Sequence, residues 1–124
     1  MSLRRLSVLQ WFGTLGAAAA VAGQFLAGAA VSQAVCNPGS ALWGVRYRPV
    51  ELALGVAGVV IVLAAEAAAF LVFRATRGTE EQDPPPEGRL HFFATAALAA
   101  NFIFLMIVAL TTIVTIANTA CRQS

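Results

Sequence analysis

Three long apolar segments alternate with short polar stretches along the chain, at residues 8–35, 50–73 and 90–120. Each exceeds the roughly 20 apolar residues that a helix needs to cross a bilayer core about 30 Å thick. The run at residues 56–63 does not alternate in polarity, as a membrane-spanning strand would. A helix also satisfies its own backbone hydrogen bonds inside lipid. The pattern therefore predicts an all-α integral membrane bundle of three transmembrane helices, with residues 1–124 as a single membrane domain.

The first connector begins with a turn-rich break at residues 36–40, where Pro and Gly oppose continuation of a helix. Trp43 and Tyr47 follow, and these aromatic side chains prefer the headgroup layer of a membrane. Arg46 and Arg48 lie beside them, and Arg side chains at this depth can reach lipid phosphates. We therefore expect these four residues to anchor the connector at the membrane interface.

The second connector, about residues 75–89, carries four acidic residues and three consecutive prolines. A segment of this composition buries too little apolar surface to fold alone, and proline-rich segments favour extended backbone. We expect a mobile or extended linker here, on the cytoplasmic side.

The distribution of arginine predicts the orientation. If the N-terminus is cytoplasmic, five Arg residues near the spans lie inside and three lie outside. Those inside are Arg4, Arg5, Arg74, Arg77 and Arg89, and those outside are Arg46, Arg48 and Arg122. Cytoplasmic loops carry the excess of basic residues, and acidic residues contribute little to this rule. The count favours an N-terminus in the cytoplasm and a C-terminus outside.

The first segment has an alternative interpretation as a cleaved signal peptide. Residues 1–6 form a basic start, and residues 32–34 resemble a signal-peptidase site. The apolar stretch between them is longer than the 7–15 residues typical of a signal peptide. This length favours a retained helix.

The composition indicates that lipid covers much of the chain. Hydrophobic residues make up 59% and charged residues 11%, against about 25% charged in soluble domains, and the mean hydropathy is +0.77. The absence of Lys and the abundance of Ala hint at a GC-rich bacterial genome, and so at a bacterial plasma membrane. The net charge of +2 is too small and scattered for nucleic-acid binding.

The two cysteines lie at matched positions. Cys36 ends the first apolar segment and Cys121 ends the third, so both face the same side. If that side is the outside, its compartment permits a disulfide. We predict a Cys36–Cys121 disulfide on the outer face, and the alternative is two unpaired thiols. A metal site is not expected, because the one His, His91, lies at the other membrane face.

Glu66, Asn101 and Gln24 are polar residues well inside the apolar segments. An ionised and unpaired carboxylate inside a membrane costs several kcal/mol, so Glu66 must be protonated, paired or facing water. Helical rise places Glu66 and Asn101 at a similar depth. We expect Glu66 to face the bundle near Asn101 or Gln24, as a hydrogen bond between helices. The alternatives are a proton or cation site for transport and a contact to a partner subunit.

The sequence lacks the motifs of a nucleophile elbow, a phosphate-binding loop or a zinc-binding helix. We therefore expect no enzymatic activity and no cofactor.

Two stretches carry a resemblance to a known group of proteins. Trp11-Phe12-Gly13 opens an Ala-rich helix that ends in Cys36, and residues 88–94 open a helix that ends in Cys121. In this order of features the chain resembles small actinobacterial-like multi-pass membrane proteins found near cytochrome c oxidase genes, over a little more than half of its length. It departs from them in lacking a Pro just before the second Cys. The resemblance implies a role in assembling a respiratory complex and transfers no catalytic residue.

From these patterns we expect a non-enzymatic accessory or assembly subunit of a larger membrane complex. Its partners would be the lipid bilayer and other membrane subunits or further copies of the chain. The competing hypothesis is a small oligomeric transporter or channel subunit that uses Glu66.

Overall fold

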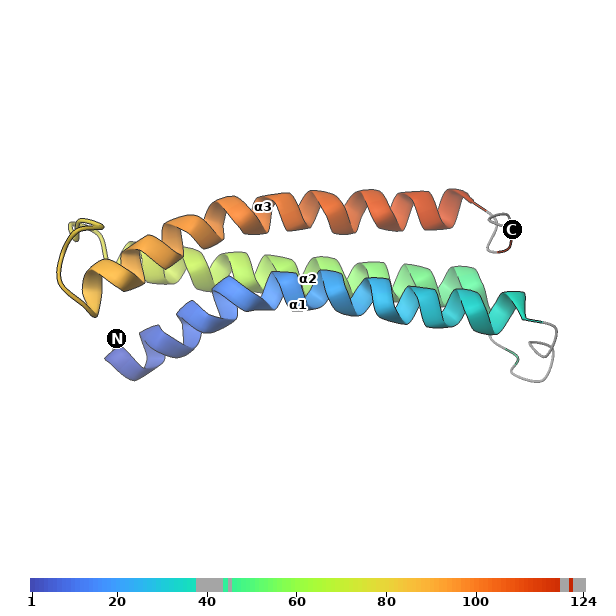
Figure 1. Cartoon of the computed structure of the whole chain (residues 1–124), viewed down its shortest axis with the longest axis horizontal. Helices are drawn as coiled ribbons and strands as arrows, with labels where there is room; N and C mark the ends of the chain where they lie inside the picture. The colour runs from blue at the N-terminus through green and yellow to red at the C-terminus, as the bar shows by residue number, and fades with distance from the viewer. Residues whose placement is uncertain (38–43, 45, 119–120, 122–124) are drawn as a thin grey trace.

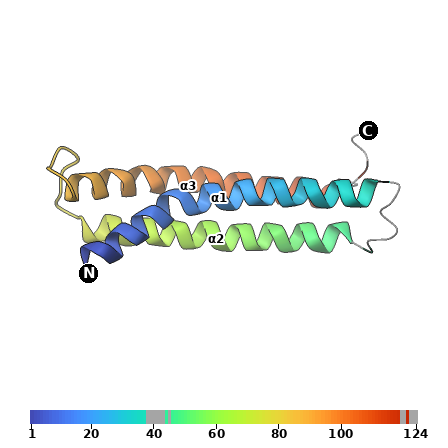
Figure 2. The ribbon, with the colours of Figure 1, turned by 60° about the horizontal axis from the view of Figure 1, so that its bottom comes forward.

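The computed structural model describes residues 1–37, 44, 46–118 and 121. It contains three long helices, α1 (Leu3–Cys36), α2 (Tyr47–Ala75) and α3 (Glu87–Ala117). The helices lie along one long axis, with α2 antiparallel to α1 and α3 (Figure 1). The start of α1 and the connector between α2 and α3 lie at one end of the bundle. The ends of α1 and α3 lie at the other (Figure 2).

All three helices are long and apolar enough to cross a membrane, which confirms the predicted fold. They contain 34, 29 and 31 residues, more than the roughly 20 that a span requires. Each begins earlier than the hydrophobic pattern predicted, because flanking polar residues continue the helical backbone. In α1, the Ser2 side chain accepts a hydrogen bond from the Arg5 backbone N–H at 3.4 Å and caps the first turn.

The buried face of α2 follows alternating spacings of four and three residues. It comprises Glu51, Gly55, Gly58, Val62, Ala65, Ala69 and Val72, with Ala68 also buried beside Ala69. This spacing is typical of helices that pack nearly parallel in a bundle. The centre is filled by small side chains, and Ala17, Ala65 and Val108 are all fully buried.

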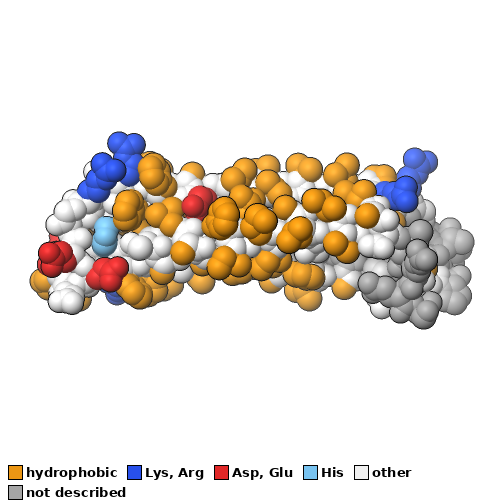
Figure 3. All heavy atoms as spheres, turned by 90° about the horizontal axis from the view of Figure 1, so that it is seen from above, with side chains coloured by type: hydrophobic (Ala, Val, Ile, Leu, Met, Phe, Trp, Pro, Cys, Tyr) orange, Lys and Arg blue, Asp and Glu red, His pale blue; other side chains and the backbone are white. Residues whose placement is uncertain are grey.

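Large apolar side chains lie mostly on the outside of the bundle. Leu26 is 74% exposed and Phe102 is 62% exposed. Apolar side chains cover the middle of the molecule, and arginines gather at its two ends (Figure 3). This is the reverse of a soluble protein's surface, and it fits a bundle surrounded by lipid.

The connector at residues 76–86 consists of turns instead of the extended segment that its composition suggested. The Asp83 carboxylate accepts a hydrogen bond from the Glu80 backbone N–H at 2.8 Å, and the Asp83 N–H donates to the Glu80 carbonyl at 3.0 Å. Gly78 has a φ of 90°, which residues with a side chain rarely adopt. A Cβ at Gly88 would overlap the Asp83 carbonyl. The short local hydrogen bonds and these two glycines make the connector compact.

His91 joins the start of α3 to the end of α2. Its Nδ1 atom lies 3.0 Å from the Thr76 hydroxyl, and its ring stacks on Phe73 with centroids 5.2 Å apart. The Thr76 hydroxyl donates to the Val72 carbonyl at 2.9 Å, so its oxygen can accept a hydrogen bond from the Nδ1–H tautomer of His91.

Candidate functional site

Asn101 lies where all three helices meet. It is 1% exposed, and its Nδ2 atom donates to the Gly13 carbonyl of α1 at 2.9 Å. Gly13 packs directly on the backbone of α2: a Cβ at Gly13 would lie 2.9 Å from the Ala69 nitrogen. The Asn101 side chain also interacts with Glu66 of α2. We call Gly13, Glu66, Ala69 and Asn101 the Asn101 node.

Glu66 occupies the edge of this node. It follows Ala65, which is fully buried, and one residue turns an α-helix by about 100°. Glu66 is therefore off the buried face and only partly buried. Its Oε2 atom is nonetheless buried and has no hydrogen-bond partner among the described residues, and the same holds for Asn101 Oδ1.

Gln24 forms a second contact between helices at another depth. It is 5% exposed, and its Nε2 atom donates to the Thr112 hydroxyl at 2.9 Å. That hydroxyl in turn donates to the Val108 carbonyl at 2.7 Å. A Cβ at Gly55 would overlap the Thr112 side chain, and a Cβ at Gly58 would lie 3.8 Å from Gln24 Oε1. We call Gln24, Gly55, Gly58 and Thr112 the Gln24 node.

The two nodes are separate. Gly13 and Gln24 are eleven residues apart on α1, which corresponds to about 16 Å along a helix. Of the two neighbours considered for Glu66 from the sequence, Asn101 contacts it and Gln24 lies at the other node. Gln24 Oε1 is buried and has no partner among the residues described.

A groove runs along the outside of the bundle between α1 and α2. Its volume is about 530 Å³, and it is lined by Trp11, Phe12, Gly16, Gly23, Gln24, Gly58 and neighbouring apolar residues. Nothing lies within 4 Å of the position that a Cβ on Gly23 would take. The groove therefore exposes helix backbone at Gly23 and passes along the Gln24 node.

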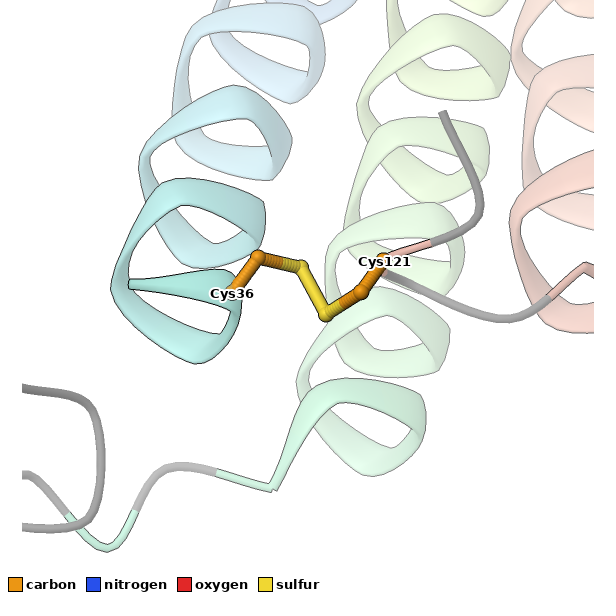
Figure 4. Close-up of a disulfide and its surroundings, with 2 residues drawn as sticks. All are labelled: Cys36 and Cys121. Carbon is orange, nitrogen blue, oxygen red and sulfur yellow. A yellow bond between two sulfur atoms is a disulfide. The ribbon is translucent and has the colours of Figure 1, made fainter. Parts of the chain in front are cut away.

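Cys36 and Cys121 form the predicted disulfide. Their Cα atoms are 5.4 Å apart, within the range that a disulfide requires. The bond ties the last residue of α1 to the segment that follows α3 (Figure 4). It lies at the opposite end of the bundle from the α2–α3 connector.

The predicted interface anchors lie at the start of α2. Arg46 and Arg48 are exposed and Tyr47, the first residue of α2, is half-buried. Their positions fit a role at the end of a span. Trp43 lies outside the described residues.

Glu51 is a buried polar residue that the sequence analysis missed. It is 2% exposed, and its carboxylate oxygens lie 3.2 and 3.3 Å from the position that a Cβ on Gly28 would take. The spacing along the sequence could have predicted its burial. Glu51 precedes Gly55 and Gly58 by four and seven residues and therefore shares their helix face.

Gln10 was missed in the same way. It is 3% exposed, and it precedes Gln24 by fourteen residues, or about four helical turns. Both glutamines therefore lie on the buried face of α1.

The described residues contain no group of three or more His, Cys, Asp or Glu side chains that could hold a metal ion. The arrangement provides hydrogen bonds between helices, one partly buried carboxyl group and an apolar groove. The chain matches no protein-family model, no curated protein and no solved structure.

Proposed function

We propose that this chain is a non-enzymatic accessory or assembly subunit of a larger complex in a bacterial plasma membrane. The observation that carries the proposal is the groove between α1 and α2, which combines an apolar lining with exposed backbone at Gly23. The resemblance to small proteins encoded near cytochrome c oxidase genes makes a respiratory complex the proposed host.

The lining of the groove favours a transmembrane helix over a lipid chain as its occupant. Gly16 and Gly23 are seven residues apart, with Ala19 and Ala20 between them. Small residues at such spacing let a second helix backbone approach closely.

The closely packed core favours a binding role over a transport pathway through a single copy of the chain. Between the two nodes the centre is filled by Ala17, Ala65 and Val108, each fully buried. Three helices packed this closely leave no polar route through the part of the bundle that the structure describes. A role in which other helices pack on the outside needs no such route.

Filling the groove at Gly23 tests this proposal. We expect Gly23→Leu to lower recovery of a co-purifying membrane subunit by about tenfold or more, equivalent to about 1.4 kcal/mol of binding free energy. Gly23 is exposed and nothing lies within 4 Å of an added Cβ, so the melting temperature should not fall and the disulfide should be unchanged. The measurement is quantitative mass spectrometry after purification from native membranes in mild detergent.

Ala99→Leu is the matched control, because Ala99 is exposed on α3 and does not line the groove. It should leave recovery of the partner unchanged. The proposal fails if wild-type protein brings down no stoichiometric subunit, if it brings down only further copies of itself, or if Gly23→Leu and Ala99→Leu behave alike.

Two observations support an orientation with the N-terminus in the cytoplasm. The arginine count favours it, and it would place the Cys36–Cys121 disulfide on the oxidising side of the membrane. In this orientation the connector at residues 76–86 is cytoplasmic.

Labelling of the connector tests the orientation. In a chain with both native cysteines replaced by Ser, Gln82→Cys is expected to react with a membrane-impermeant maleimide only after the cells are opened. Gln82 is exposed in the connector, so its accessibility depends on the side of the membrane. Labelling of intact cells would reverse the proposed topology.

A further inference from the structure

The start of α1 forms an open cavity on the outside of the bundle. Its volume is about 620 Å³, and it is lined by Met1, Ser2, Arg4, Arg5, Val8 and Leu9. Leu6, on the inner face of the same turn, packs with Val72 of α2 and Leu90 of α3. By contrast, both arginines and Val8 are exposed. The cavity therefore combines two cationic side chains with apolar ones on the outer face of α1.

The two arginines have no acidic partner on their own helix, because α1 contains no Asp or Glu. The hydrogen bond that Arg5 makes to Ser2 uses its backbone N–H. Neither the Arg4 nor the Arg5 guanidinium forms an ion pair within the described part of the chain. Both positive charges are therefore available to a ligand.

The acidic residues at this end of the bundle lie on other elements. Those of the connector and the start of α3 are Glu80, Glu81, Asp83 and Glu87. Figure 1 and Figure 2 both show the start of α1 turning away from this connector. The acidic group is thus set apart from the cavity.

The length of α1 places the cavity in the headgroup layer of a membrane. The helix has 34 residues, or about 51 Å, against a hydrocarbon core of about 30 Å. When the span is centred, about 10 Å of helix extends past the core at each end, which is about seven residues. Arg4 and Arg5 then lie among the lipid phosphates. Val8, about 6 Å deeper than Arg4, lies where the acyl chains begin.

A phospholipid with an anionic headgroup matches this arrangement in chemistry and in depth. Arg side chains bind phosphate oxygens through paired N–H groups, and clusters of basic residues at a membrane surface attract anionic lipids. The apolar side chains favour a ligand with acyl chains over free phosphate. A zwitterionic lipid also carries a phosphate, but its ammonium group would be repelled by the two arginines.

We propose that the start of α1 binds an anionic phospholipid, with Arg4 and Arg5 contacting the headgroup and Val8 and Leu9 contacting the acyl chains. The cavity shares no lining residue with the groove between α1 and α2. The lipid site therefore does not depend on the partner proposed for that groove.

Native mass spectrometry of the full chain tests the site. The purified protein is freed of lipid in detergent and titrated with phosphatidylglycerol, or with phosphatidylethanolamine that carries the same acyl chains. Wild type should bind one phosphatidylglycerol about tenfold or more tightly than phosphatidylethanolamine. Arg4→Gln/Arg5→Gln should weaken phosphatidylglycerol binding by about tenfold or more, because both cationic contacts are lost. Inorganic phosphate at millimolar concentration should not displace the lipid.

Arg46→Gln/Arg48→Gln is the matched control, because it removes the same charge from two exposed arginines at the other end of the bundle. This variant should bind phosphatidylglycerol as wild type does, and both double variants should keep the helical content and the disulfide. Sodium chloride should weaken binding to wild type, which tests the charge contact without any substitution. Equal losses in the two double variants would overturn the proposal. Equal binding of the two lipids, displacement by inorganic phosphate or binding that ignores salt would also overturn it.

Discussion

Gly13→Ala is expected to lower the free energy of unfolding by about 1–3 kcal/mol, the usual cost of overfilling a packed site. The added Cβ would lie 2.9 Å from the Ala69 nitrogen and 3.1 Å from its Cα atom. These are backbone atoms of α2, so the clash cannot be relieved by rotating a side chain. Separating α1 from α2 would also strain the hydrogen bond from Asn101 to the Gly13 carbonyl, a type worth about 0.6 kcal/mol in membranes.

Gly23→Ala is the matched control for this prediction. It makes the same substitution on the same helix, at a position with nothing within 4 Å of the new Cβ. Ala is the better helix former by about 0.5–1 kcal/mol, so this variant should be as stable as wild type or slightly more so. Reversible unfolding in mixed micelles, followed by circular dichroism, measures the difference. Equal stabilities of the two variants would show that α1 and α2 do not touch at Gly13.

Reduction of the Cys36–Cys121 disulfide is expected to destabilise the bundle by about 2–4 kcal/mol. The bond closes a loop of 85 residues, for which chain entropy alone would give about 4–5 kcal/mol. The expected value is smaller because helices inserted in a membrane already restrict the unfolded chain. The bond also joins the end of α1 to the segment after α3. These two helices share the smallest interface in the bundle, so little other packing compensates for loss of the bond.

Thermal unfolding in detergent, with and without reductant, measures this contribution. The double variant Cys36→Ser/Cys121→Ser should melt where the reduced wild type melts and should not respond to reductant. Free thiols in unreduced protein from the membrane, or equal melting temperatures of the oxidised and reduced forms, would contradict the prediction.

Length and composition were sufficient to predict the three spans and the all-α fold, because a bilayer sets a minimum length for an apolar helix. The disulfide followed from two cysteines that end spans on the same side. The bounds of the helices were less accurate, since hydropathy ends where polar residues begin, whereas the hydrogen-bonded backbone of α1 continues to Leu3.

The packing within the bundle was harder to predict, for a physical reason. In a soluble helix, polar residues mark the outer face. Here the outer face is apolar because lipid covers it: Phe102 next to the buried Asn101 is 62% exposed. The buried faces are marked only by small and polar residues, which is why the burial of Glu51 near the start of the second span was missed. The contact between Gly13 and Ala69 left no distinctive signal in an Ala-rich sequence.

The equal spacing of the two nodes limits how this chain can change in length. Gly13 and Gln24, Gly58 and Ala69, and Asn101 and Thr112 are each separated by eleven residues. Eleven residues complete three turns at about 3.67 residues per turn, so both nodes face the same interior seam. One residue inserted or deleted between them would rotate one node away by about 100°. Evolution can therefore lengthen or shorten the connectors and the helix ends of this chain, but these three intervals must keep the same number of residues.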